Sequence, residues 1–284
     1  MGLIVEPWYF TNYVDNFGTT PASLHGTTVT PGVLNADGTA AQLLAAQTFD
    51  IYYIVVGLAG YNATGTAMNA LADILIDPAG GTAWKVLISG LVCGFTGGYT
   101  AGVQATLMYR FPIYIEAGAT IGCQTQVSAA SPPSAGITKV TIQAYGPPSR
   151  PDVWWCGAGV ETLGVTAATS TAVSVTPGNT GAYGNWATIG TSTARYGSIQ
   201  MGLNGVDSNM NAAQYFFQVG RNNVAIPSHP TMAAATTTLE AVYYSYMYGP
   251  TWCDIPSGTA LQVRGTCSGT AEVWAGGAAI YGVY

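Results

Sequence analysis

The stretch Ile255–Arg264, IPSGTALQVR, parallels an earlier one, Ile115–Gln124, IEAGATIGCQ. In each, a small residue and a glycine come first, and alternating apolar residues follow. Glycine suits a tight reversal because it has no Cβ and reaches positive φ without strain. Each stretch therefore predicts a turn that leads into a strand, with Gly118 and Gly258 at the turn.

Other matches occur in the same order along the chain. The tetrapeptide VTPG is found at residues 29–32 and again at 175–178, and IVVGLAG at 54–60 matches IQMGLNG at 199–205. Ordered matches indicate an internal duplication, with plain gene doubling of no geometric use as the alternative. Because the repeat is near 140 residues, it predicts two tandem domains rather than a solenoid.

Weaker matches extend the comparison. Asp73–Ile76 aligns with Tyr215–Gln218, and Trp8 has a counterpart in Trp154 and Trp155. The boundary is predicted at the proline-rich stretch 147–151, which is stiff enough to act as an extended linker. We therefore expect an N-terminal domain with an extended N-terminal arm over residues 1–147, and a C-terminal domain over 148–284.

The spacing of turn residues favours an all-β fold. Gly- and Pro-containing turns recur every 8–12 residues or so, as in sandwiches and barrels. About eight strands in each half predict two tandem antiparallel β-sandwiches of the jelly-roll type, related by duplication. The octet Ala40–Gln47, AAQLLAAQ, is the best helical candidate and predicts one or two turns of helix.

The composition combines few charges with many hydrophobic residues. Charged residues make up 7% of the 284, hydrophobic residues 49%, and the net charge is −6. Such a chain buries a core, and the absence of a basic patch argues against nucleic-acid binding. The start, MGLIVEPWYF, does not resemble a secretory signal, and the longest apolar run, Ile51–Gly60, is too short to span a bilayer, so no membrane insertion is expected. So few charges favour a surface that is hidden in a homo-oligomer or solvated by hydroxyls and amides.

The sequence lacks motifs for catalysis, cofactors or metals. His25 and His229 are the only histidines, and no nucleophile elbow, zinc motif or phosphate loop occurs. Asp73 and Asp77 are interpreted as residues of a strand and its turn, not as a glycosidase pair. We therefore predict a protein that is not an enzyme, with no catalytic, cofactor-binding or metal-binding residues and no cofactor.

Five cysteines are scattered without a metal-binding spacing, which favours reduced thiols. Cys253 and Cys267 flank the turn and strand of the second repeat, and a disulfide between them across a hairpin is left open.

The candidate contact residues are aromatic. In the segment Thr236–Tyr248, alternation places Tyr244, Tyr246 and Tyr248 on one face of an expected strand. This tyrosine ladder has two interpretations: contact with a subunit or glycan, or burial in a central strand. Trp8, Trp154 and Trp155 are the other candidates for an interface.

The turn–strand IPSGTALQVR, the terminal AAIYG-type strand, the tandem repeats and the Gly/Thr/Ala bias resemble virion proteins of tailed bacteriophages, in particular jelly-roll proteins of the head surface or tail appendages. The resemblance implies assembly in the host bacterial cytoplasm, localisation in the virion, and an oligomeric role without catalysis.

Two functions are compatible with this resemblance. The first is a capsid decoration (cement) protein that binds major capsid subunits or other virion proteins, as a homo-oligomer for which a trimer is the simplest guess. The second is a receptor- or glycan-binding fibre or appendage, with a glycan as its partner. A polysaccharide-degrading enzyme is a distant third.

Overall fold

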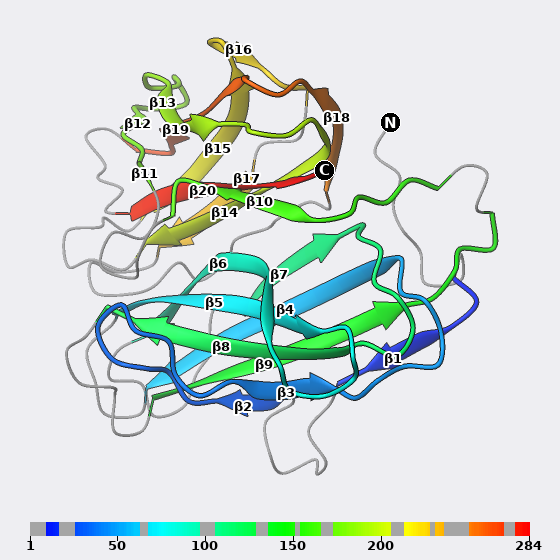
Figure 1. Ribbon diagram of the computed structural model, residues 1–284. Coiled ribbons are helices and arrows are strands. Elements are labelled where there is room, and N and C mark those ends of the chain that lie inside the picture. The colour runs from blue at the N-terminus through cyan, green and yellow to red at the C-terminus, as the bar shows by residue number, and fades with distance from the viewer. Residues whose placement is uncertain are drawn as a thin grey trace.

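The computed structural model describes most of the 284-residue chain. The described residues are 10–16, 26–62, 68–96, 106–128, 136–150, 154–165, 173–205, 213–227, 231–235, 250–269 and 276–284. Within these ranges the regular structure is all strand (Figure 1). No helix long and apolar enough to cross a membrane occurs in the described part.

The first half contains nine strands: β1 (Tyr13–Asp15), β2 (Thr27–Val29), β3 (Ala41–Leu44), β4 (Tyr53–Asn62), β5 (Met68–Asp77), β6 (Lys85–Thr96), β7 (Thr106–Phe111), β8 (Thr120–Val127) and β9 (Gly136–Tyr145). They form two layers. One has the order β1-β9-β4-β7, with β2 also on β9, and the other has the order β3-β8-β5-β6. A short parallel pairing of β4 with β6, at Gly60 and Tyr61, joins the layers into one nine-stranded sheet.

The second half repeats this plan. Its strands are β10 (Val160–Leu163), β11 (Val173–Ser174), β12 (Pro177–Gly178), β13 (Ala187–Thr191), β14 (Tyr196–Gly205), β15 (Ala213–Arg221), β16 (Val224–Ala225), β17 (Thr231–Ala235), β18 (Thr251–Ile255), β19 (Ala260–Cys267) and β20 (Gly276–Val283). One sheet has the order β10-β20-β14-β18, with β11 on β20. The other has β12-β19-β15-β16, with β13 on β19 and β17 on β15.

In both halves the first and last strands are neighbours and most connections cross from one sheet to the other. This is the strand order of a jelly roll, in which two Greek keys pack as two sheets. The sequence-based fold class, two tandem jelly-roll-like sandwiches, is confirmed.

Equivalent glycines show that the halves are copies. Gly118 and Gly258 have φ of 90° and 81°, and each N–H donates at 2.8 Å to a carbonyl, that of Gln47 or Ser192. In the two VTPG segments, Gly32 pairs in parallel with β8 and Gly178 with β19. The duplication predicted from the sequence is therefore present in the sheet register.

One weak sequence match is wrong by three residues. Asp73 lies opposite Gln124 on β8, and the equivalent position to Gln124 on β19 is Arg264, which lies opposite Gln218. Asp73 thus corresponds to Gln218 rather than to Tyr215. The error arises because apolar strand residues match one another at several offsets.

The helix predicted for Ala40–Gln47 is also wrong. Ala41–Leu44 forms β3, which pairs antiparallel with β8 and shifts register between Gln42 and Leu44. An eight-residue helix is marginal in water, whereas the free edge of β8 offers ladder hydrogen bonds. Tertiary pairing therefore overrides the local helix propensity.

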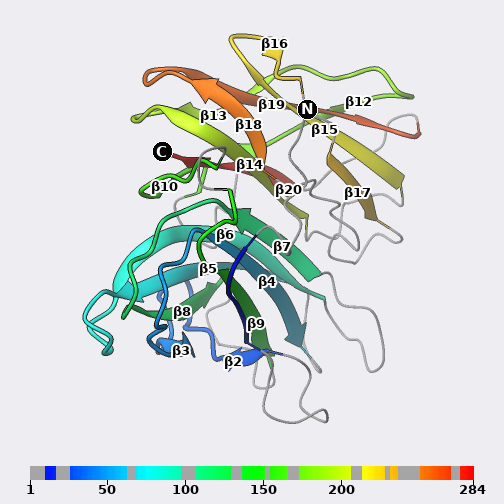
Figure 2. The ribbon, with the colours of Figure 1, turned by 90° about the vertical axis from the view of Figure 1, so that its right-hand side faces the viewer.

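The two jelly rolls are in contact through the outer face of β20 (Figure 2). Tyr281 is fully buried there and its ring meets Tyr109 of β7 edge-on, with centroids 5.3 Å apart. The Tyr281 hydroxyl donates to the Gly90 carbonyl at 2.9 Å and accepts from the Val92 N–H at 2.8 Å. Val160, Ala279 and Val283 pack into the same cluster as the core of the first half, so the contact is a continuation of that core.

The predicted division at residue 147 stays a prediction. The named strands β1–β9 pair among themselves, as do β10–β20, and isolated bridges join Phe10 to Pro148 and Ile113 to Gly157. Thr11 also donates its N–H to the Pro147 carbonyl at 2.9 Å. Part of the proline-rich stretch is thus attached to the first jelly roll.

All five cysteines are free thiols. Cys253 lies on β18 and Cys267 on β19, which belong to different sheets, so the hairpin considered for a disulfide does not form. Burial raises the pKa of the Cys93 thiol to about 12. A buried thiol with so high a pKa is a packing residue rather than a nucleophile.

Candidate functional site

Six aromatic side chains form one continuous cluster, which we call the aromatic junction: Phe10, Tyr53, Tyr145, Trp154, Trp155 and Trp252. Ring centroids along it lie 5.0 to 6.2 Å apart, from Phe10 and the two tyrosines to Trp154, then Trp252 and Trp155. The Trp pairs meet at 80° and 83°, the edge-to-face geometry that aromatic quadrupoles favour. The junction therefore connects residues of the two jelly rolls.

The sheet register explains the first part of the junction. Tyr53 of β4 lies directly opposite Tyr145 of β9, on the side of the sheet that faces away from the main core. Tyr53 is only 2% exposed, because Phe10 and Trp154 cover it. A sheet face that would otherwise meet water is thus covered by the segments that precede β1 and follow residue 153.

Three polar atoms in the junction are buried without a hydrogen-bond partner in the described part of the chain. They are the Tyr53 hydroxyl and the Nε1 atoms of Trp154 and Trp252. Burial raises the pKa of Tyr53 well above its ordinary value, so its phenol is neutral. Each indole N–H can only donate, which means that these positions suit an acceptor oxygen from water or from a ligand.

Trp155 is the exposed end of the junction, at 39% exposure. Its six-membered ring lies against the backbone of Gly197 on β14, where a Cβ would fall 2.6 Å from the ring. Trp252 contacts it from the side. The glycine thus holds the indole close to the strand, with part of the ring open to solvent.

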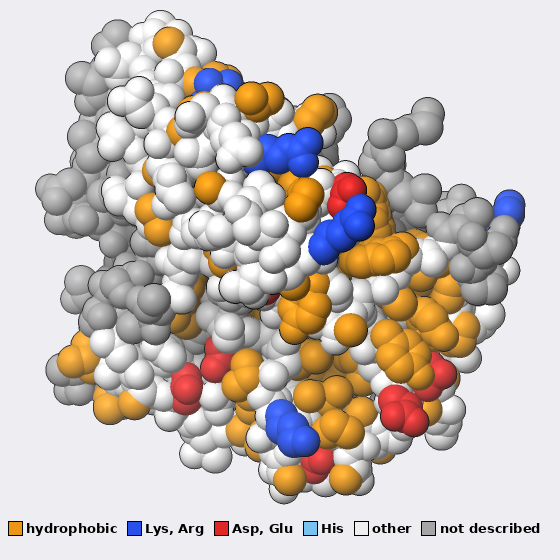
Figure 3. Space-filling view, turned by 45° about the horizontal axis from the view of Figure 1, so that its top comes forward, with side chains coloured by type: hydrophobic (Ala, Val, Ile, Leu, Met, Phe, Trp, Pro, Cys, Tyr) orange, Lys and Arg blue, Asp and Glu red, His pale blue; other side chains and the backbone are white. Residues whose placement is uncertain are grey.

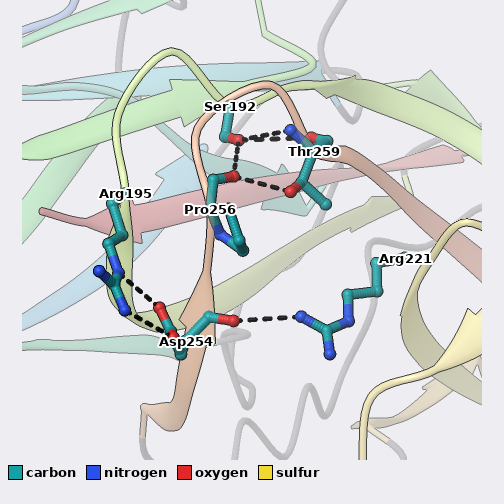
Figure 4. Close-up of polar contacts among 6 residues, drawn as sticks. All are labelled: Ser192, Arg195, Arg221, Asp254, Pro256 and Thr259. Atoms are coloured by element: carbon teal, nitrogen blue, oxygen red, sulfur yellow. Dashed lines mark hydrogen bonds and ion pairs between the residues drawn. The ribbon is translucent and has the colours of Figure 1, made fainter.

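Two residues after Trp252 on β18, Asp254 is part of a charged group (Figure 4). Arg195 donates from Nε and Nη2 to the two carboxylate oxygens of Asp254, each at 2.7 Å, and Arg221 donates to the Asp254 carbonyl at 3.1 Å. The side chains of Arg195 and Asp254 are 73% and 63% exposed. The two hydrogen bonds from Arg195 lower the pKa of Asp254, so its carboxylate is ionised at neutral pH.

The turn beside this group is fixed by short polar contacts. Ser192 donates to the Pro256 carbonyl at 2.9 Å and accepts from the Thr259 N–H at 3.0 Å, and Thr259 donates from its hydroxyl to Pro256 at 2.7 Å (Figure 4). These bonds join the β13–β14 connection to the turn of IPSGTALQVR. Arg195 and Asp254 are therefore presented from two segments held at a fixed separation.

Glu161 of β10 also binds the β13–β14 connection. Its carboxylate accepts from the N–H groups of Thr193, at 3.0 Å, and Ala194, at 3.4 Å, and from the Tyr196 hydroxyl. Burial raises the pKa of Glu161, but the bonds from Tyr196 and the two amides outweigh it, so its net pKa is lowered.

We expect Glu161→Gln to destabilise the protein by about 1–2 kcal/mol at pH 7, because a charge-assisted hydrogen-bond set is lost. Since the folded-state pKa of Glu161 is below its ordinary value, its stabilisation is present above the unfolded pKa and lost as pH falls through the folded pKa. Urea denaturation of both proteins at pH 7 and at pH 3 measures this. A stability difference that persists unchanged at pH 3 would contradict the role given to the carboxylate.

The sequence-based site residues have mixed outcomes. Trp154 and Trp155 come together in the junction. Trp8 and the ladder Tyr244, Tyr246 and Tyr248 lie outside the described residues.

Sequence reasoning missed four members of the junction: Trp252, Phe10, Tyr53 and Tyr145. For Trp252 a signal was present, because it lies three residues before the stretch Ile255–Arg264 and two residues before Asp254 on the same strand.

The acidic residues considered for catalysis have structural roles. Asp77 accepts from the N–H groups of Ala79 and Ala83 at 2.9 and 2.8 Å, which confirms its interpretation as a turn residue. Asp73 accepts from Gly90 N–H at 2.7 Å. Across the described residues, no three His, Cys, Asp or Glu side chains gather as a metal-binding group.

Comparison with known proteins finds a fold likeness alone. No protein-family model and no curated protein matches the sequence. Among solved structures, PNGF-II is similar with a TM-score of 0.41 and 7% identity over 95% of this chain, which spans 65% of that protein. The CBM22-1-CBM22-2 tandem domain of Paenibacillus barcinonensis Xyn10C has a TM-score of 0.29 and 7% identity, over 96% of this chain and 89% of that one. The human norovirus GI.7 virus-like particle has a TM-score of 0.25 and 9% identity, over 94% of this chain and 69% of that one.

These similar structures are β-rich, as is this chain, and include a CBM22 pair and a viral capsid assembly. At such low identities and TM-scores they carry no argument about function. The class of protein defined by the strand order is a tandem jelly-roll protein.

Proposed function

We propose that this protein is a non-enzymatic virion protein of a tailed bacteriophage that decorates the head by binding major capsid subunits. The observation that carries the proposal is the continuous core between the two jelly rolls around Tyr281, which joins them into one unit. A cement protein works by bridging neighbouring subunits, and a rigid bridge loses little conformational entropy when it binds.

The surface composition supports contact with other proteins. Lys and Arg number seven in 284 residues, and charged side chains are sparse on the face shown in Figure 3. Large apolar side chains are exposed over both halves: Tyr13, Val33, Leu34, Val86, Met108, Tyr114, Trp155, Val224 and Tyr284. Depletion of charge and exposure of aromatic residues are features of the cores of protein interfaces.

Assembly as a homo-oligomer, most simply a trimer, belongs to this proposal, as do synthesis in the host cytoplasm with reduced thiols and final localisation in the virion. The tyrosine ladder Tyr244, Tyr246 and Tyr248 and the exposed Trp155 are the proposed contact residues.

Co-sedimentation with capsid shells tests the proposal. Purified protein mixed with shells that lack it should pellet with them at a fixed stoichiometry and raise the temperature at which they rupture. Protein that stays in the supernatant at micromolar concentration, with shells of unchanged stability, would rule out a cement role. Cryo-microscopy of the parent particle then locates the density on the shell or on the tail.

A second candidate, a glycan-binding appendage protein, is favoured by one observation: the partly exposed indole of Trp155, held close to the backbone of Gly197.

A further inference from the structure

We propose that the outer face of the second jelly roll binds a saccharide that carries a carboxylate, at a site formed by Trp155, Trp252, Arg195, Arg221 and Asp254. We call these residues the indole–guanidinium patch. The inference goes beyond the decoration role, because a head protein with this site would also attach to an acidic polysaccharide.

Trp155 supplies an apolar platform for a sugar ring. Gly197 supports one side of its six-membered ring and Trp252 fixes its edge, so the indole is ordered before a ligand arrives. A rigid, amphipathic aromatic ring gives contact area at low entropic cost, and the C–H face of a pyranose matches it. Its 39% exposure leaves room for one such contact.

The strand geometry places polar groups beside this platform. On β18, Cys253 packs against the core of the second half, which leaves its neighbours Trp252 and Asp254 on the outer face, at a point where the register with β14 shifts. The next residue, Ile255, is buried in the core, which puts Asp254 on the outer face. On β14, Tyr196 is likewise buried, and Arg195 precedes it at the surface.

The bidentate ion pair between Arg195 and Asp254 leaves donors and acceptors that a ligand can use. Arg195 donates from Nε and Nη2 to the carboxylate, and within the described residues no partner is seen for its Nη1, whose N–H groups can donate to a ligand hydroxyl. Each Asp254 oxygen keeps a lone pair that can accept from a hydroxyl. A planar pair with adjacent donors and acceptors matches the neighbouring hydroxyls of a sugar.

Charge favours an acidic sugar over a neutral one. The described part of the patch holds two guanidinium groups and one carboxylate, that of Asp254, which pairs with Arg195. Arg221 contacts the carbonyl of Asp254 rather than its carboxylate, and it is exposed. Among the side chains of the patch one positive charge is therefore left over, and the neighbouring carboxylate of Glu161 is already bound by the Thr193 and Ala194 amides and the Tyr196 hydroxyl. A uronate carboxylate complements it, since guanidinium binds carboxylates in a bidentate fashion.

Titration of the full-length protein with uronate oligosaccharides tests the proposal. The probes are oligomers of galacturonate, glucuronate, mannuronate and guluronate, each compared with its methyl ester, which keeps the ring and removes the charge. Saturation-transfer NMR and calorimetry should show binding of at least one free acid, at least about tenfold tighter than its ester, a difference of about 1.4 kcal/mol. No binding by any of the four acids, or equal binding of acid and ester, overturns the proposal.

Variants then assign the binding to the patch. Trp155→Ala should weaken binding at least about tenfold, and Arg221→Gln, at an exposed side chain, should remove the preference for the acid over the ester. Val86→Ala, at an exposed apolar residue of β6 in the first jelly roll, is the control and should bind as the wild type does. Wild-type binding by Arg221→Gln overturns the site, whether or not Trp155→Ala folds. Capsid co-sedimentation is measured separately, so failure of saccharide binding is distinguishable from failure of the decoration role.

Discussion

Replacing Tyr281 by alanine should lower the free energy of unfolding by about 4 kcal/mol, the largest effect expected for a single side chain between the two jelly rolls. Truncating a buried aromatic residue costs about 3–5 kcal/mol, and the Gly90 carbonyl and Val92 N–H would also lose their partner. Since domains are stable by about 5–15 kcal/mol, this loss is a large fraction of the total. Urea denaturation followed by circular dichroism and tryptophan fluorescence measures it.

Tyr281→Phe is the matched control for this prediction. It keeps the ring against Tyr109 and removes only the hydroxyl, so we expect a loss of about 1–3 kcal/mol. The alanine variant should also separate the unfolding of the halves, with two transitions where the wild type has one. If Tyr281→Ala unfolds at the wild-type urea concentration, the halves are not coupled through this residue.

The duplication could be predicted from sequence because it rests on backbone requirements. Gly118 and Gly258 adopt positive φ, and Gly32 and Gly178 lie where a Cβ would collide with backbone atoms. Such positions retain the same residue in both copies while strand residues drift. The spacing of turn residues then predicted about eight strands in each half, whereas the described residues form nine in the first half and eleven in the second, several of them only two or three residues long.

The aromatic junction could not be predicted, because its contacts depend on how separate segments are placed. Phe10 and Tyr145 are 135 positions apart, yet their rings lie 5.1 Å from each other. Alternation shows that Tyr53 is on one face of β4 but not that a second segment buries that face. The same limit applies to Arg195 and Asp254, which are ordinary surface residues until the β13–β14 connection brings them together.

Gly178→Ala should destabilise the second jelly roll by about 3 kcal/mol. A Cβ at this position would lie 2.2 Å from the Ala182 carbonyl oxygen and 2.6 Å from the Gly184 nitrogen. Both are backbone atoms of the same tight loop, so relief requires the loop to open and overpacking strain of this size results. Gly32→Ala should cost about the same in the first jelly roll, because its Cβ would lie 2.1 Å from the Ala36 carbonyl oxygen. Thermal and urea denaturation of the two variants measure the effects.

Gly258→Ala separates steric collision from backbone strain. Its φ is 81°, but no atom of the described residues lies within 4 Å of the added Cβ, so the cost is that of a left-handed alanine, about 1–2 kcal/mol. Gly118→Ala, at φ 90° and with the same free space, should behave alike. We therefore expect alanine to cost more stability at Gly32 and Gly178 than at Gly118 and Gly258. Within each pair the two halves should lose about the same stability. A Gly178→Ala variant as stable as Gly258→Ala would show that the loop relaxes freely, and unequal members within a pair would show that the copies have diverged in packing even where they share a backbone.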